Sequence, residues 1–234
     1  MRAPGAADAP LIVVCGLAFE AVIAAGPGIV TVCGPGPRRV AERLDALLAC
    51  GVAGAPAAWA GIISLGCAGG LDPLLRPGAC VVASSVHTAF ETIVADPAWA
   101  CALLARLPQA SPGLIAGLDA PLGAAAGKAR LWQASGARTV DMESHAAALA
   151  ARRHGLPFAA CRVVLDPAWR SLPGSALAAM REDGGTDVPA LMHALACAPR
   201  EIGPLAMLAL DAWRARLALR RLRVQLGAAL APPP

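Results

Sequence analysis

Short apolar runs, bounded by glycine, proline or charged residues, divide the chain into segments. They lie at 11–15, 29–33, 60–65, 79–84 and 158–165, with a weaker one at 113–117. Each run is short, and its apolar residues follow one another without the spacing of an amphipathic helix. Runs of this kind are typical of strands that are buried on both faces of a sheet.

Helical patterns lie between these runs. We expect helices at 38–49, at the start of 96–113, at 128–135, and from Glu143 to the stop signal Gly155-Leu156-Pro157. In the last of these, small alanines share the face of Glu143, so another backbone can approach that face closely. The alternation of strands and helices predicts a single α/β domain with a largely buried sheet.

The end of the chain has a different character. No linker precedes residue 198, so we predict a catalytic domain at 1–198 and a basic Leu/Arg-rich helical extension at 199–234. Apolar residues of the predicted helix 201–226 fall on two opposite faces, with arginines between them. Two readings stay open: peripheral contact with anionic lipid, or packing onto the core or between subunits.

Composition narrows the class of protein. Hydrophobic residues make up 57% of the chain, yet no apolar run reaches the ~18 residues that a transmembrane helix needs. We read the apolar N-terminal stretch as the first strand rather than a signal peptide, so we expect a cytoplasmic protein. The eight cysteines are scattered without metal-site spacing, so we expect no metal and a reducing compartment.

Charge is unevenly distributed. Residues 201–234 hold five arginines against two acids, a net of +3, which leaves +1 of the total +4 for residues 1–200. A body this close to neutral gives no reason to expect a nucleic acid partner.

Candidate chemistry lies at the ends of the predicted strands. Asp166 ends the run 158–165, at the edge of a sheet where α/β proteins bind ligands. Asp141-Met142-Glu143 places two carboxylates at a helix start. After the strand at 60–65 we expect a glycine-rich loop at 66–70, which lets a ligand approach the backbone. Arg38 and Arg39 follow a Gly/Pro turn, which is either an anion site or a tight turn with solvated arginines.

Four stretches together resemble the nucleoside phosphorylase and nucleosidase superfamily. They are GLAFEA at 16–21, LGCAGGLDPLLRPGACVVAS at 65–84, VDMESHAAA at 140–148 and CRVVLDPA at 161–168. The run DPAWRSLP at 166–173 is similar to the hopanoid-associated phosphorylase branch. The resemblance implies a three-layer fold with a central mixed sheet flanked by helices, and a homo-oligomer.

The same resemblance implies cleavage of the N-glycosidic bond of a purine nucleoside. The expected substrate is adenosylhopane, which would release adenine, with phosphate as co-substrate and no cofactor. The alternatives are hydrolysis by water, as in methylthioadenosine/adenosylhomocysteine nucleosidases, and a catalytically silent protein that binds a nucleoside or a lipid.

Roles for single residues also follow from the resemblance. Asp166 would protonate the leaving purine, Glu143 would accept hydrogen bonds from the ribose hydroxyls, and Glu20 would activate water in the hydrolytic alternative. The other positions are expected to contact substrate or phosphate. They are Met142 at the sugar, Cys67, Ala68 and Gly69 at the substrate, Leu122 at the base, and Gly66, Arg38 and Arg39 at phosphate.

Overall fold

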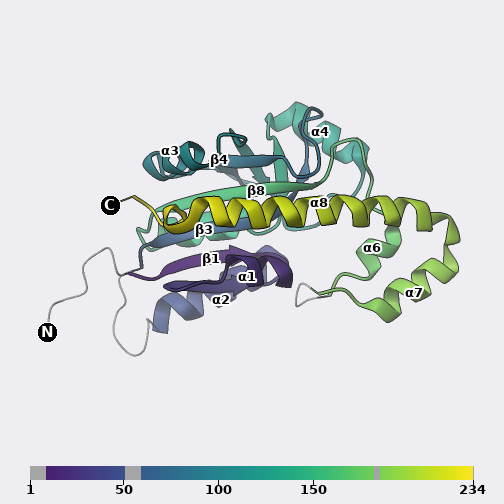
Figure 1. Ribbon diagram of the computed structural model, residues 1–234, viewed down its shortest axis with the longest axis horizontal. Helices are drawn as coiled ribbons and strands as arrows, with labels where there is room; N and C mark the ends of the chain where they lie inside the picture. Colours follow the sequence, from purple (N-terminus) through teal and green to yellow (C-terminus); the bar gives the residue numbers. More distant parts are fainter. Residues whose placement is uncertain (1–8, 51–58, 182–184, 234) are drawn as a thin grey trace, which may run out of the picture.

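The computed structural model describes residues 9–50, 59–181 and 185–233 (Figure 1). Its strands are β1 (Leu11–Cys15), β2 (Ile29–Cys33), β3 (Gly61–Gly70), β4 (Cys80–His87), β5 (Thr92–Val94), β6 (Ser111–Gly117), β7 (Thr139–Asp141) and β8 (Phe158–Asp166). Its α-helices are α1 (Ala18–Ala24), α2 (Pro37–Cys50), α3 (Pro97–Arg106), α4 (Ala125–Ser135), α5 (Ser144–Arg153), α6 (Gly174–Ala178), α7 (Val188–Cys197) and α8 (Ile202–Leu226).

The strands form one mixed sheet. Its order is β2-β1-β3-β7-β6-β4-β5, and β8 pairs with both β3 and β4. β3 is parallel to β1 and β8, whereas β7 runs antiparallel to β3. Because β3, β8, β4, β6 and β7 each pair with the next and the last pairs with the first, they form a closed ring. The ring brings the ends of β3, β7 and β8 together.

Helices cover the sheet on two sides, as the alternation of β1 side chains shows. Ile12 and Val14 belong to a hydrophobic cluster with α2 and α5. Leu11 and Val13 belong to a second cluster with α3 and α8. Successive strand residues point to opposite faces, so an apolar run without alternation requires a layer on each side. The predicted three-layer α/β fold with a mixed sheet is confirmed.

The predicted strand positions agree well at the start of the chain, where β1 and β2 begin and end as expected. The expected glycine-rich loop at 66–70 is wrong, because β3 continues through it to Gly70 and pairs with β8 along that length. The glycine at 66 serves packing. A Cβ there would lie 2.5 Å from Oε2 of Glu20 and 2.7 Å from Nη1 of Arg162.

The C-terminal helix α8 runs along β8 and in front of the sheet in Figure 1. Leu219, Leu222 and Leu226 are buried in the same cluster as α3 and the strands, so α8 packs onto the core. The division of the chain at residue 198 stays a prediction. The sequence did not indicate the helices α6 and α7. The start of α6 is held near the start of α8, because the N–H groups of Gly174 and Ser175 donate to Glu201. Within the described ranges, no helix is both long and apolar enough to span a membrane.

Candidate active site

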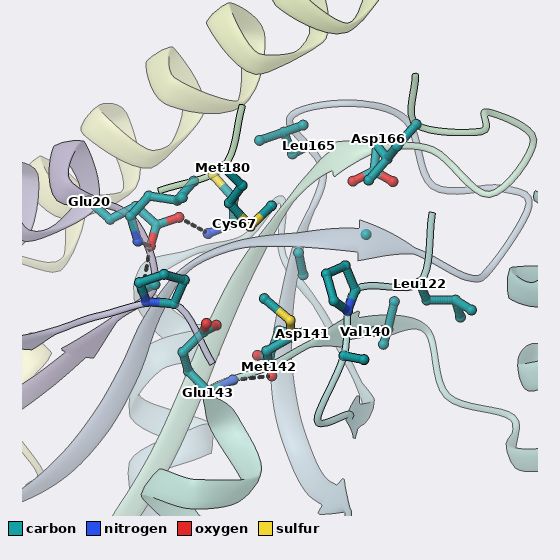
Figure 2. Close-up of a pocket in the computed structure, with 18 residues that line it drawn as sticks. Glu20, Cys67, Leu122, Val140, Asp141, Met142, Glu143, Leu165, Asp166 and Met180 are labelled. Carbon is teal, nitrogen blue, oxygen red and sulfur yellow. Dashed lines mark hydrogen bonds between the residues drawn. The ribbon is translucent and has the colours of Figure 1, made fainter. Parts of the chain in front are cut away.

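A cavity opens where β3, β7 and β8 end, and it collects most of the residues singled out in the sequence (Figure 2). Glu20 and Glu143 lie on one side of it, and Asp166 and Leu122 on the other. The remaining predicted substrate contacts line it as well. They are Met142, Cys67, Ala68 and Gly69. The topology therefore gathers residues from five separate parts of the chain.

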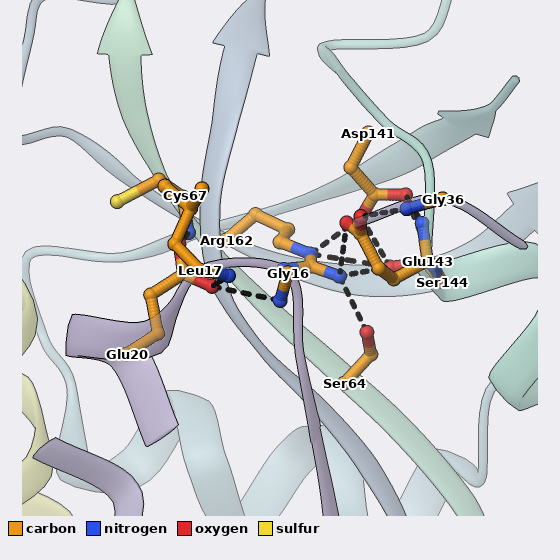
Figure 3. A network of polar contacts seen from close by, with 10 residues as sticks. All are labelled: Gly16, Leu17, Glu20, Gly36, Ser64, Cys67, Asp141, Glu143, Ser144 and Arg162. Carbon is orange, nitrogen blue, oxygen red and sulfur yellow. Dashed lines mark hydrogen bonds and ion pairs between the residues drawn. The ribbon is translucent and has the colours of Figure 1, made fainter. Parts of the chain in front are cut away.

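Arg162 organises the side of the cavity where the sequence resemblance predicts the ribose, which we call the sugar side (Figure 3). It is fully buried on β8, and its guanidinium pairs with Asp141 and lies 3.8 Å from Glu143. Its Nη2 also donates to the hydroxyl of Ser64. Asp141 in turn accepts the backbone N–H groups of Glu143 and Ser144 at the start of α5. Asp141 thus caps the helix and neutralises the arginine.

Glu20 lies on the first turn of α1, with its carboxylate turned into the protein. Three backbone N–H groups donate to it, from Gly16 at 2.9 Å, Leu17 at 3.0 Å and Cys67 at 2.7 Å. Burial raises the pKa of Glu20, and Arg162 with the three N–H groups opposes that rise. A carboxylate whose pKa is raised is a stronger base than an ordinary one, which suits a general base.

Glu143 is the second carboxylate of the sugar side. Its Oε1 accepts the N–H of Gly36 at 3.1 Å. Burial raises the pKa of Glu143 to about 7, with Arg162 lowering it and Asp141 raising it. Its charge therefore changes near neutral pH.

A lysine organises the opposite side of the cavity, where the sequence resemblance predicts the purine and which we call the base side. Asp166, the last residue of β8, pairs through Oδ2 with Nζ of Lys128 on α4. Burial raises the pKa of Asp166, and the ion pair with Lys128 opposes that rise. Desolvation and the ion pair thus change the pKa of Asp166 in opposite directions.

The wall around Asp166 is apolar. Leu122, Val140 and Leu165 line it together with Pro121. The thiol of Cys67 has a raised pKa, because it is buried and lies beside Glu20. A thiol held protonated is a poor nucleophile, so Cys67 serves this wall as a small apolar group.

Three predicted phosphate contacts lie away from the cavity lining. Gly66 lies against the side chains of Glu20 and Arg162 and does not line the cavity. Arg38 and Arg39 line a wider neighbouring cavity of about 820 Å³, which shares Pro35 with the first. The side chain of Arg38 is 91% exposed and pairs with Glu42. The role of these residues in phosphate binding stays a prediction.

Two functional residues escaped the sequence reasoning. Arg162 stands in the quoted run 161–168, and Lys128 begins a predicted short helix, yet neither received a role. The signal for Arg162 was a charge inside a strand that is otherwise apolar, since a buried charge requires partners. For Lys128 the signal was weaker, because a helix start gives no hint that its side chain is buried.

Comparisons with known proteins identify the fold and the family. The 5′-methylthioadenosine/S-adenosylhomocysteine nucleosidase of Neisseria meningitidis is 16% identical, with a TM-score of 0.62 over 92% of this chain and 98% of that one. The futalosine hydrolase of Helicobacter pylori is 14% identical, with a TM-score of 0.62 over 92% of this chain and 97% of that one. The S-adenosylhomocysteine nucleosidase of Streptococcus pyogenes is 18% identical, with a TM-score of 0.59 over 68% of this chain and 84% of that one.

These likenesses show the fold. No match was found among proteins of curated function. The model of the phosphorylase superfamily matches residues 7–196. Since this match spans most of the sequence, the chain belongs to the phosphorylase superfamily.

Proposed function

We propose that this chain cleaves the N-glycosidic bond of a purine nucleoside, with water as the nucleophile. The observation that carries the proposal is the division of the cavity, with Glu20 and Glu143 on one side and Asp166 on the other (Figure 2). Breaking this bond leaves positive charge on the sugar and negative charge on the purine. The two sides of the cavity match the two charges.

On the sugar side, carboxylates favour the developing cation. Glu143 accepts hydrogen bonds from ribose hydroxyls, and Met142 packs against the sugar. Glu20 takes a proton from water as the water attacks the sugar carbon. The charge of Arg162 favours the carboxylate forms of both glutamates, and its Nη1 is buried without a hydrogen-bond partner among the described residues.

On the base side, a proton must reach the leaving purine. Asp166 delivers it to a ring nitrogen, and the apolar wall of Leu122, Val140 and Leu165 excludes water from the base. General acid catalysis of this kind contributes about a hundredfold to ten thousandfold. The adenine of the relatives' named substrates fits a wall of this type, since it offers flat apolar faces.

Charge favours water over phosphate. Four carboxylates line the cavity, namely Glu20, Asp141, Glu143 and Asp166, and its described lining includes no basic side chain. The backbone N–H of Cys67, a donor that phosphate would need, instead donates to Glu20 at 2.7 Å. Phosphorolysis stays the alternative. It requires the Glu20 carboxylate to leave three N–H groups so that an anion can take its place.

The size of the site bears on the substrate. The first cavity encloses about 150 Å³, less than the roughly 300–1,000 Å³ typical of small-molecule sites. The wider cavity beyond Pro35 offers room for a substituent on the sugar. Adenosylhopane, which the sequence resemblance suggests, carries such a substituent and stays our candidate among lipid-linked nucleosides.

A lipid-linked substrate would bring the protein to a membrane. Met207, Leu210 and Trp213 of α8 are exposed, whereas the leucines further along are buried. The arginines of the helix follow these exposed apolar residues. The apolar side chains could enter a lipid surface while the arginines pair with anionic headgroups. Trp213→Ala with Leu210→Ala should lower co-sedimentation with anionic liposomes, and unchanged co-sedimentation would end this part of the proposal.

The function is tested by release of free purine from a panel of adenine nucleosides, followed by chromatography. We expect release by the wild type and a loss of about a hundredfold to ten thousandfold in Asp166→Asn. Asp45→Asn, at an exposed surface pair, is the matched control and should be fully active. Tight nucleoside binding without release in the wild type would show a binding protein instead of an enzyme.

A further inference from the structure

Lys128 is the only lysine of the chain, whose other 19 basic residues are all arginines. It is also fully buried. A chain that uses arginine for every other positive charge retains an ammonium at this one position. A compact ammonium and a planar guanidinium make different hydrogen bonds, so the exception points to a geometric requirement.

The contacts of Lys128 define that requirement. Its Nζ donates to Oδ2 of Asp166, to the carbonyl oxygen of Pro167 at 3.1 Å and to that of Arg170 at 3.0 Å. An ammonium has three N–H donors, and these three acceptors use all of them. Lys128 therefore has no donor left for a ligand. Its bonds hold the acid and the loop after it in one arrangement.

The position of Lys128 on α4 supports the same reading. It lies in the first turn of the helix, where the helix dipole disfavours a positive charge, and no acidic residue of α4 stands there to compensate. The compensation comes from Asp166 on another element. The loop is tied to α4 a second time, since the N–H of Ala125 donates to Oγ of Ser171 at 3.0 Å.

We propose that Lys128 is the positioning residue of the base side: it fixes Oδ2 of Asp166 so that Oδ1 is presented to the purine. This inference rests on the proposed function. The bond to Lys128 orients the carboxyl group and stabilises the carboxylate that remains after its proton has passed to the purine. When the purine arrives, Asp166 meets it from one direction only, which reduces the reorganisation needed for proton transfer.

Other charged and titratable groups also face Asp166, and they limit what Lys128 can do alone. Asp211 of α8 raises the pKa of Asp166, although Arg170 and Arg214 partly neutralise Asp211. Cys67 of β3 lies across from Asp166 as a protonated thiol. Among these side chains, Lys128 hydrogen-bonds the acid directly, and the backbone N–H of Asp166 itself also bonds to its carboxylate.

The first test is the pH dependence of kcat/KM for purine release in Lys128→Met, which keeps the apolar stem and removes the charge. Without its cation, the buried Asp166 should stay protonated to higher pH, so the alkaline limb should move upward by about 1–3 pH units. Lys128→Arg keeps the charge but not the three converging bonds. It should lower kcat while leaving that limb nearer its wild-type position.

A uniform loss of activity in Lys128→Met at every pH, with the alkaline limb unmoved, would reduce Lys128 to a structural residue and overturn the inference. If the wild type releases no purine, the proposed function fails instead. A second readout then still tests the contact. The single lysine gives a single side-chain signal in ¹⁵N-lysine NMR, and we expect it to be protected from solvent exchange in the wild type.

That NMR signal should lose its protection in Asp166→Asn and should shift when adenine is added to the wild type. Asp45→Asn is the matched control and should leave the signal unchanged. A signal that exchanges freely in the wild type, or that ignores both adenine and Asp166→Asn, would contradict the inference.

Discussion

Arg162 and Lys128 are both fully buried cations of the active site, but their surroundings differ. Arg162 lies among three acids, Glu20, Asp141 and Glu143, and retains a buried N–H without a hydrogen-bond partner among the described residues. Lys128 has one acid and two carbonyls, which use all its donors. The cation of the sugar side therefore has a buried donor unused, whereas the cation of the base side has all its donors bonded.

This difference has a physical consequence for each side. The three acids hold the pKa of Arg162 above its ordinary value although burial opposes its charge, so its charge is permanent. The glutamates around it have raised pKa values and can exchange protons. On the base side, the acid and its cation form one pair, Asp166 with Lys128. In the proposed function, the sugar side therefore stabilises charge, and the base side delivers a proton in a fixed direction.

Arg162→Met should cause the largest loss of stability. It leaves three buried acids without their shared cation, and breaking a buried ion pair costs about 3–5 kcal/mol of unfolding free energy. Urea unfolding followed by circular dichroism measures this loss. Arg153→Met is the matched control, because Arg153 is half exposed in its pair with Asp45 and should cost less than about 1 kcal/mol. Equal stability of the two variants would contradict the assigned role of Arg162.

A change of intermediate size is expected from Glu143→Gln. With a pKa of about 7, Glu143 is a carboxylate above that pH, so kcat/KM of the wild type should rise through pH 7 on its acidic limb. A hydrogen bond to a charged group contributes about 1.5–3 kcal/mol, so the variant should lose about tenfold to a hundredfold. Its acidic limb should be flatter. An acidic limb that is the same in both proteins would exclude Glu143 as its source.

Glu143 also has a predicted effect on stability. Its pKa in the folded protein lies above that of an ordinary glutamate, so the folded state binds more protons between pH ~4.5 and pH ~7. The wild type should therefore lose stability as the pH rises through this window, and Glu143→Gln should lose less. The slope of unfolding free energy against pH measures this contribution.

The smallest effect is expected at α8. Asp211 is buried there, and its Oδ2 lies 2.8 Å from Nη1 of Arg170, whose carbonyl binds Lys128. Asp211→Asn should cost about 1–2 kcal/mol of stability and lower purine release less than Lys128→Met does. A larger loss of activity than in Lys128→Met would show that Asp211 of α8, and not Lys128, is the main positioning residue of the base side.

Local patterns predicted much of the fold. The apolar runs at 11–15 and 29–33 became β1 and β2, since burial on both faces leaves little freedom in their composition. The stretch 66–70 was read as a loop because glycine disfavours strands in isolation. There the close approach of Glu20 and Arg162 requires glycine inside a strand, and that depends on tertiary contacts.

The candidate site was also partly predictable. Asp166 ends a strand and Glu143 precedes a helix, and sequence patterns are informative at such positions. Met142 is predicted together with its neighbour Glu143. Arg162 and Lys128 depend on which elements pack against each other: Arg162 of β8 reaches Ser64 of β3, and Lys128 of α4 reaches the end of β8. Distances of 98 and 38 residues along the chain hide such pairs from local reasoning.

Purine release with and without phosphate tests whether Glu20 directs water to the sugar. We expect equal rates in phosphate-free buffer and at saturating phosphate, with free sugar as the product. A folded Glu20→Gln variant should lose purine release under both conditions. Release that requires phosphate, yields a sugar phosphate and survives in Glu20→Gln would contradict the claim.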